Sequence, residues 1–201
     1  MKSRTLIATS LVLALTAALA LAQYGSGKNN KPKQPADTRS LEGKKAPDFT
    51  LPMIDGQDLK LSEQKGNVVV LDFWATWCGP CVKALPHVQE LASDTELAQK
   101  GLKVYAVNMT TWKPETEEKA REFVKANNYT FPVPLDREGK LAESYKIQGI
   151  PTQVVIGRDG MIKKVFVGDG GENLTKAIEQ ALRAKAPANA KGPATKPSSE
   201  G

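Results

Sequence analysis

The chain has 201 residues, a formal net charge of +6, two cysteines and one histidine. Two cysteines exclude a small scaffold held together by several disulfides. Even with the histidine they fall short of the four ligands of a closed structural zinc site, so we expect no metal. No basic run interleaved with aromatic residues is present, and we therefore do not expect a nucleic-acid partner.

The amino terminus has the features of an export signal. Lys2 and Arg4 precede the uncharged, Leu- and Ala-rich segment 6–22, which ends in a small-x-small tripeptide. This order is typical of a secretory signal peptide, so we predict that residues 1–22 are cleaved before Gln23. The alternative is an uncleaved membrane anchor through residues 6–22, because this length is close to the shortest that spans a bilayer. Both readings predict a periplasmic or otherwise extracytoplasmic bacterial protein.

Two stretches of biased composition frame a single predicted domain. Residues 23–45 and 186–201 are rich in Gly, Pro, Lys and small polar residues, as flexible linkers and tails are. Residues 46–185 carry the regular apolar patterns, and their number suits one domain with a full core. Because much of the positive charge lies in the two flanking segments, we expect it to favour solubility.

The domain alternates predicted strands and helices. Apolar or alternating runs predict strands at residues 48–51, 58–61, 68–73, 102–108, 131–135, 152–156 and 161–167. Helical periodicity and start signals predict helices at residues 78–98, 114–127, 141–145 and 172–185. Turn signals at 55–56 and 157–160 predict two hairpins. The order indicates an α/β fold with a mixed central sheet flanked by helices on both faces.

Both cysteines stand directly after the buried strand 68–73, in Trp77-Cys78-Gly79-Pro80-Cys81. Cys78 is expected at the positive end of a helix dipole, which favours its thiolate. Side chains three positions apart share one helix face, and a Cα separation of roughly 5–6 Å suits a disulfide. The pattern predicts a redox-active pair. A passive disulfide is the alternative, although its loop is too short to stabilise the fold much.

These motifs resemble the thioredoxin superfamily. The run from Val68 to Cys81 and the later segment 149–152 (Gly-Ile-Pro-Thr) carry the resemblance. Segments 46–51 and 59–62, the export signal and the extra helix before Phe131 are similar to the TlpA/ResA-like branch of extracytoplasmic thiol-disulfide oxidoreductases. The resemblance covers about residues 46–183. It implies a thioredoxin-like fold with an N-terminal β-hairpin and one inserted helix.

The resemblance implies three catalytic residues. Cys78 is the expected nucleophile, partly exposed, and Cys81 is the resolving thiol. Asp72 is expected beneath Cys81, where it moves a proton; the alternative is an aspartate that meets water at the strand end. Two positions depart from the family pattern: alanine, at about Ala106, replaces a lysine partner on the next strand, and Ala84 replaces a glutamate frequent in the cytochrome-maturation branch.

Residues 150–152 are expected to bind substrate. The resemblance implies that Ile150-Pro151-Thr152 places a cis-proline against the disulfide; a cis X-Pro bond is uncommon and usually marks a tight functional turn. The Ile150 backbone is then expected to pair with an extended substrate segment, like an added strand. The alternative is an ordinary trans-proline that opens the following strand.

The residues beside the cysteines are expected to shape the same site. Gly79 and Pro80 should tune the redox potential, because Pro80 removes an amide donor from the first helical turn. The resemblance implies that a Gly-Pro pair goes with reducing members. Trp77 is expected over the sulfurs. Trp112 is either at the border of the substrate groove or an ordinary surface residue.

The expected function is thiol-disulfide exchange with exported proteins. The protein would use its Cys78–Cys81 dithiol to reduce their disulfides, with cytochrome c maturation as a candidate process. We expect a monomer without bound cofactor, recharged by a membrane electron donor. One alternative is a peroxiredoxin-like peroxidase, although the Pro-x-x-x-Thr-x-x-Cys loop of that family is missing. The other is a non-catalytic metal- or peptide-binding module.

Overall fold

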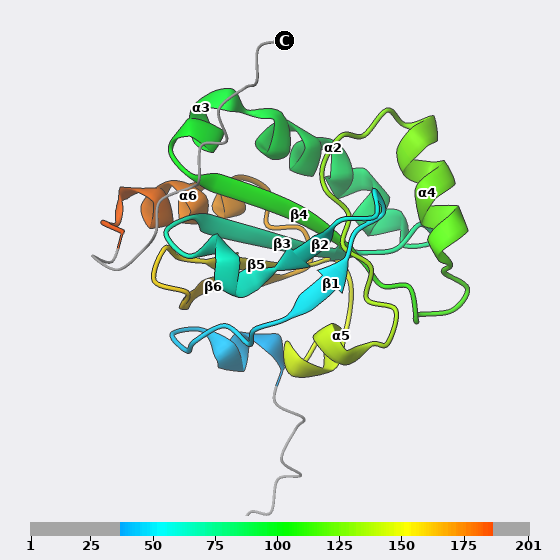
Figure 1. Cartoon of the computed structure of the whole chain (residues 1–201), viewed down its shortest axis with the longest axis horizontal. Helices are drawn as coiled ribbons and strands as arrows, with labels where there is room; N and C mark the ends of the chain where they lie inside the picture. Colours follow the sequence, from blue (N-terminus) through cyan, green and yellow to red (C-terminus); the bar gives the residue numbers. More distant parts are fainter. Residues whose placement is uncertain (1–36, 187–201) are drawn as a thin grey trace, which may run out of the picture. The chain divides into compact units, whose positions relative to one another are not determined.

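A computed structural model describes residues 37–186. The helices are η1 (Thr38–Leu41), η2 (Leu61–Gln64), α2 (Gly79–Ser93), α3 (Thr95–Gln99), α4 (Glu117–Ala126), α5 (Lys140–Ser144) and α6 (Gly171–Arg183). The strands are β1 (Thr50–Pro52), β2 (Asp58–Lys60), β3 (Val68–Trp74), β4 (Leu102–Asn108), β5 (Thr152–Ile156) and β6 (Ile162–Val167). Figure 1 shows this α/β arrangement.

The central sheet is mixed, as predicted, with the strand order β4-β3-β5-β6. Strand β3 pairs in parallel with β4 and antiparallel with β5, and β5 and β6 form the expected antiparallel hairpin. Every residue of β3 is buried, which explains its continuous apolar sequence. The strand that leads to Cys78 is therefore held on both edges and covered on both faces.

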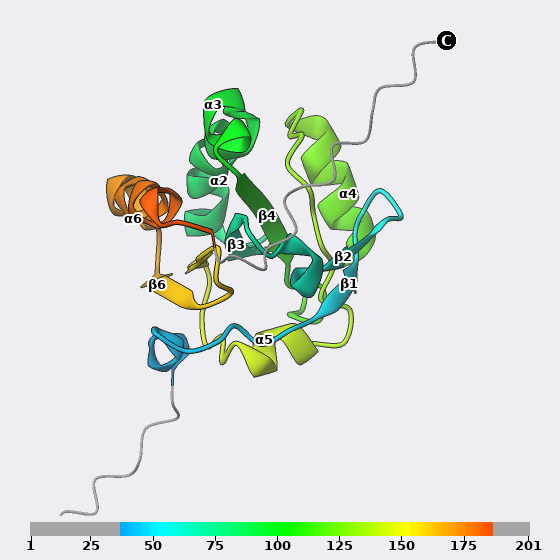
Figure 2. The ribbon, with the colours of Figure 1, turned by 60° about the vertical axis from the view of Figure 1, so that its left-hand side comes forward.

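Helices cover both faces of the sheet and enclose two apolar cores. One core lies under α2, α4 and α6 and includes Val70, Leu85 and Ile178. The other lies under α5, η1 and the β1–β2 hairpin and includes Phe73 and Tyr145. Figure 2 shows α2, α4 and α6 on one side of the sheet and α5 on the other. The cysteines belong to the first core, so packing of α2 on the sheet positions them.

The predicted N-terminal hairpin forms a separate two-stranded sheet. Strands β1 and β2 pair antiparallel with Leu51 opposite Leu59. Gly56 takes a φ of 86° in the turn, a conformation that residues with a Cβ rarely adopt. The hairpin lies beside the inserted helix α4, because Arg121 donates a hydrogen bond of 2.7 Å to the Ile54 carbonyl oxygen.

Two predicted helices have different bounds in the structure. The helix predicted at 78–98 is divided into α2 and α3 at Asp94, whose side chain accepts a hydrogen bond from the Leu97 N–H and begins a new helix. The helix predicted from Pro114 begins only at Glu117. Thr116 caps it, and Pro114 lies before the cap after a cis peptide bond with Lys113.

The prediction of a strand at residues 131–135 is wrong, because the structure has no regular strand there. Pro132 and Pro134 lack an N–H, so this segment cannot donate along a regular ladder. It instead accepts through its carbonyl oxygens, from the N–H of Ala106 to Pro132 and from that of Asn108 to Pro134. The segment thus lies along β4 with isolated bridges in place of a strand.

Residues 37–45, predicted as part of the flexible linker, pack on the domain. Leu41 is buried, and Thr38 Oγ1 donates a hydrogen bond to the Lys146 carbonyl oxygen. Glu42 Oε1 accepts from the Val165 N–H on the edge strand β6. These partners lie more than 100 residues away in the chain, so local composition does not reveal them.

The other terminal predictions concern residues that the structure leaves undescribed. The signal or anchor at 1–22, the linker residues 23–36 and the tail residues 187–201 all lie outside the described range. Within residues 37–186, none of the helices combines the length and apolar character needed to cross a bilayer.

Candidate active site

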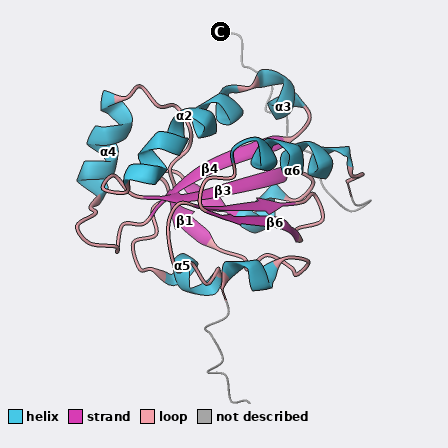
Figure 3. Ribbon diagram, turned by 180° about the vertical axis from the view of Figure 1, so that it is seen from behind, coloured by secondary structure: helices cyan, strands magenta, loops and turns pink. Residues whose placement is uncertain are grey.

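The redox pair follows β3 at the start of α2; Figure 3 shows these two elements in the fold. Cys78 is the N-cap residue of α2, and its Sγ accepts a hydrogen bond of 3.2 Å from the Cys81 N–H. Pro80 occupies the first turn, where a helix needs no donor. A sulfur at this point feels the positive end of the helix dipole, which stabilises a thiolate.

Cys78 and Cys81 form a disulfide with a Cα–Cα distance of 5.2 Å, within the separation expected from the sequence. Cys81 is 1% exposed, and Cys78 is only 4% exposed. The expectation that Cys78 is partly exposed is therefore wrong, because the residue as a whole is buried. The reason is close packing: the Ile150 carbonyl oxygen lies 3.7 Å from Cys78 Sγ.

The Ile150–Pro151 peptide bond is cis, as expected, and its loop lies against the disulfide. Two hydrogen bonds hold the loop: Thr152 Oγ1 donates to the Gly149 carbonyl oxygen at 2.7 Å, and the Gly168 N–H donates to the Pro151 carbonyl oxygen at 2.8 Å. Thr152 is buried at the start of β5. The structure thus brings the two sequence motifs together at one point.

The three tryptophans have different environments. Trp77 is 44% exposed and its Nε1–H donates to the Trp112 carbonyl oxygen at 3.0 Å. Trp74 is fully buried and donates to the Ala106 carbonyl oxygen. Trp112 packs against the second core. Trp77 is thus the exposed aromatic side chain next to Cys78, with its ring nitrogen fixed by the segment that follows β4.

Asp72 is 1% exposed in the middle of β3, which excludes a carboxylate that meets water at the strand end. Burial raises its pKa to about 7, the neighbouring side chain of Gln153 partly offsets the rise, and the negative charge of Asp169 adds to it. Asp72 Oδ1 and Gln153 Nε2 both lack a hydrogen bond of ordinary geometry. A carboxyl group in this state can take up or release a proton near neutral pH.

The two departures from the family pattern are visible beside the site. The register places Ala106 of β4 next to Asp72, so no lysine neutralises the aspartate from that strand. Ala84 is buried in α2, one turn after Cys81, where the cytochrome-maturation branch often has a glutamate. Apolar methyl groups at both positions leave burial as the dominant influence on the pKa of Asp72.

Sequence reasoning missed two polar residues of this region. Gln153 was assigned only to a strand, but it lies opposite Asp72 and is fully buried. The helix predicted at 114–127 would place Glu115 in its first turn, but Glu115 lies before the cap and is 1% exposed. Its Oε2 accepts hydrogen bonds from the N–H and the Oγ1 of Thr76, at 2.6 and 2.8 Å. Thr116 followed by Glu117 and Glu118 was the available signal that the helix begins later.

No group of three or more His, Cys, Asp or Glu side chains within residues 37–186 is arranged to hold a metal ion. The two sulfurs are bonded to each other. The site brings together the cysteine pair and the cis-proline loop.

Comparison with known proteins agrees with this geometry. The family model described as Redoxin matches residues 41–182. Thiol-disulfide oxidoreductase ResA of Bacillus cereus is 31% identical over 168 residues, 84% of this chain and 90% of its own. Thioredoxin-like protein YneN of Bacillus subtilis is 38% identical over 141 residues, 70% and 78% of the two chains.

A solved structure extends the comparison. The exposed lipoprotein thioredoxin of Streptococcus pneumoniae has a TM-score of 0.60 and 32% identity, over 67% of this chain and 99% of its own. The fold, the paired cysteines and the named relatives agree on one activity, thiol-disulfide exchange. The chain belongs to the Redoxin family, and within the thioredoxin superfamily it is a ResA-like thiol-disulfide oxidoreductase.

Proposed function

We propose that the protein reduces disulfides of exported proteins by two successive thiol-disulfide exchanges. The observation that carries this proposal is the position of Cys78 Sγ at the N-terminus of α2, 3.2 Å from the Cys81 N–H. In the reduced protein this donor and the helix dipole favour the Cys78 thiolate, which is the nucleophilic form. Cys81 lies one turn further along α2 and is more deeply buried.

The first exchange joins protein and substrate. The Cys78 thiolate attacks one sulfur of the substrate disulfide, the substrate S–S bond breaks, and the other substrate sulfur leaves as a thiolate. A mixed disulfide between Cys78 and the substrate results. The cis-proline loop supports this step, because the Ile150 backbone adjoins Cys78 Sγ and can pair with an extended segment.

The second exchange releases the substrate. Asp72 accepts the proton of the Cys81 thiol, and the Cys81 thiolate attacks Cys78 Sγ. The mixed disulfide breaks and the second substrate sulfur leaves as a thiolate, so two electrons have passed to the substrate. The pKa of Asp72, raised to about 7, supports this role because a base near neutral pH is poised to receive a proton.

The direction of exchange and its setting are also part of the proposal. Gly79-Pro80 between the cysteines resembles reducing members, and the predicted export signal favours an extracytoplasmic location. The exposed lipoprotein thioredoxin among the similar structures supports that location. A membrane electron donor must then reduce the Cys78–Cys81 disulfide after each cycle. The resemblance of the sequence to the TlpA/ResA-like branch makes cytochrome c maturation a candidate process.

Trapping the mixed disulfide tests the order of the two cysteines. Cys81→Ser should accumulate a covalent complex with a model substrate disulfide, because the first exchange proceeds and the second cannot. Cys78→Ser should form no such complex and should lose reductase activity. A complex that forms through Cys81 in the Cys78→Ser variant would overturn the assignment.

The equilibrium potential of the pair tests the direction. We expect a value near that of thioredoxin, about −270 mV. A value near about −120 mV would identify an oxidant and refute reduction of substrates. The same titration against glutathione or dithiothreitol requires no knowledge of the natural substrate.

A further inference from the structure

The segment between β4 and α4 holds the loop that leads to Cys78. Glu115 Oε2 accepts the N–H and the Oγ1–H of Thr76, at 2.6 and 2.8 Å. The Trp112 carbonyl oxygen accepts the ring N–H of Trp77 at 3.0 Å. The same carbonyl oxygen accepts the backbone N–H of Glu115, also at 3.0 Å. Three hydrogen bonds thus fix the two residues that immediately precede the proposed nucleophile.

Glu115 is an unusual choice for a purely structural contact. Its side chain is buried, at 1% exposure, and forms no ion pair within residues 37–186. Hydrogen bonds alone therefore compensate its charge: those of Thr76 and one of 3.4 Å from Asn108 Nδ2. A buried carboxylate is costly unless well bonded, and charged acceptors make the stronger hydrogen bonds. The arrangement favours a firm and specific hold on the Thr76 backbone.

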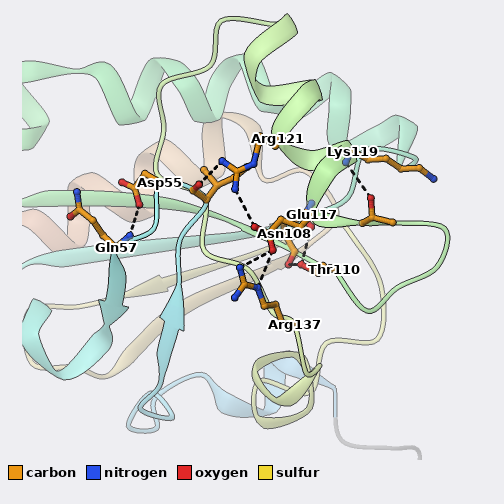
Figure 4. A network of polar contacts seen from close by, with 10 residues as sticks. Asp55, Gln57, Asn108, Thr110, Glu117, Lys119, Arg121 and Arg137 are labelled. Carbon is orange, nitrogen blue, oxygen red and sulfur yellow. Dashed lines mark hydrogen bonds and ion pairs between the residues drawn. The ribbon is translucent and has the colours of Figure 1, made fainter.

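The residues after Glu115 are anchored to other parts of the domain. Glu117 pairs with Arg121 at 3.1 Å and with Arg137 at 2.7 Å (Figure 4). Lys119 Nζ donates to the Pro114 carbonyl oxygen at 2.7 Å. These contacts join the start of α4 to its own first turns and to the loop before α5. The backbone on both sides of Glu115 is therefore fixed by hydrogen bonds and ion pairs.

We propose that Glu115 is a positioning residue for the exchange reaction. It holds Thr76 and, through the shared segment, Trp77, so that Cys78 begins α2 with its Sγ directed at the Cys81 N–H. The inference rests on the proposed role of Cys78 as the attacking sulfur. It also gives the inserted helix α4 a function, because α4 anchors the segment that carries Glu115.

The test compares Glu115→Ala with Asp136→Ala as a matched control. Asp136 is also a buried carboxylate that accepts two backbone N–H groups, from Leu141 and Ala142, but it serves the start of α5. Glu115→Gln is the conservative variant, because an amide oxygen can still accept from Thr76. The readouts are amide hydrogen exchange measured by NMR and the rate at which the reduced protein attacks a model disulfide.

We expect Glu115→Ala to speed exchange of the Thr76 amide by about tenfold or more, as loss of a charged hydrogen bond allows. The attack rate should fall by about tenfold, since misplacement of a reacting group is costly. Glu115→Gln should restore both readouts to within about threefold of the wild type. Asp136→Ala should leave the Thr76 amide unchanged, whatever its effect on stability.

Three results would overturn the inference. The first is unchanged Thr76 exchange in a folded Glu115→Ala protein. The second is faster Thr76 exchange with an unchanged attack rate, which leaves the proposed function intact. The third is an equal loss of rate in Asp136→Ala. If Glu115→Ala does not fold, the attack rates of Glu115→Gln, Thr76→Val and Thr76→Ser are compared instead. Among these variants only Thr76→Val removes the hydroxyl that donates to residue 115, so only Thr76→Val should attack more slowly. Equal rates in these variants would overturn the proposal.

Discussion

Two buried carboxyl groups, Asp72 on β3 and Glu115 in the segment before α4, have different hydrogen-bond environments. Glu115 and Asp72 are each 1% exposed. Glu115 receives two short hydrogen bonds from Thr76 and a longer one from Asn108. Asp72 has an oxygen without any hydrogen bond, and its neighbour on β4 is an alanine.

The difference indicates separate roles: Glu115 is suited to orient a loop, and Asp72 is suited to the proposed proton transfer. A carboxylate surrounded by donors orients the groups that donate to it, which suits Glu115 to hold a loop. A buried carboxyl group with few donors is penalised when ionised, so its proton stays bound to higher pH. Burial is the main cause of the raised pKa of Asp72, about 7, and this pKa is the basis of the proposed proton exchange with Cys81.

The largest effect that we expect is on the rate of the second exchange step, when Asp72 is replaced. Asp72→Asn removes the proposed proton acceptor, and release of substrate from the mixed disulfide should slow by roughly a hundredfold at neutral pH. Rapid-quench kinetics separate this step from the first attack, which should change little. Asp58→Asn, on the exposed edge of β2, serves as the control. Equal slowing of both steps would contradict the proton-transfer role.

The next effect concerns stability and its pH dependence. The unfolded chain releases the Asp72 proton near the ordinary pKa of 3.8, whereas the folded chain keeps it up to about pH 7. Raising the pH through this window therefore favours the unfolded state, and the cost is fully present above pH 7 and absent below pH 4. Asp72→Asn should raise the free energy of unfolding by roughly 4 kcal/mol above this window.

Denaturant unfolding of wild type and Asp72→Asn at several pH values checks this expectation. The two curves of stability against pH should converge in acid and separate as the pH rises. A constant difference across the range would mean that the substitution acts through packing alone.

Glu115→Ala should change the free energy of unfolding in the opposite direction to Asp72→Asn, and by a smaller amount. Removing the acceptor leaves the Thr76 donors unpaired, and the free energy of unfolding should fall by about 2 kcal/mol. Chemical denaturation at pH 7 measures the loss. A variant as stable as the wild type would break the distinction drawn here, because Glu115 would then contribute no more than a surface residue.

The smallest effect concerns Asp169. Its negative charge raises the pKa of Asp72, although less than burial does. Asp169→Asn should therefore lower the pKa of Asp72 slightly, and added salt should have an effect in the same direction on the wild type, because Asp169 is exposed and its field is screened. A rise in this pKa would contradict the account.

The sequence predicted the parts of the site that local pattern determines. The apolar run into Cys78 and the three-residue spacing to Cys81 were sufficient to anticipate the strand and the disulfide, and the resemblance carried by Gly-Ile-Pro-Thr at 149–152 implied the cis bond. The alanine beside Asp72 was also anticipated, from the resemblance to thioredoxins, which have a lysine at about this position of the next strand. In each case the signal lies within a few residues of the feature.

The parts that were missed depend on distant partners. Glu115 is recognised as part of the site only when Thr76, 39 residues earlier, is seen to donate to it. Leu41 and its neighbours look like linker by composition, yet they pack on β6 and the segment near Lys146. The segment that contains Pro132 and Pro134 looks compatible with a short strand. Neither proline has an N–H to donate to β4, so a regular ladder does not form.

Titration of the Asp72 carboxyl carbon by ¹³C NMR, in the oxidised protein, tests the central claim most directly. Assignment follows from the one resonance that disappears in Asp72→Asn. The account predicts a midpoint at about pH 7, the pH at which this group can give and take the proton of Cys81. A midpoint near the ordinary value of 3.8 would contradict it, because Asp72 would then be ionised at neutral pH and unable to hold a proton there.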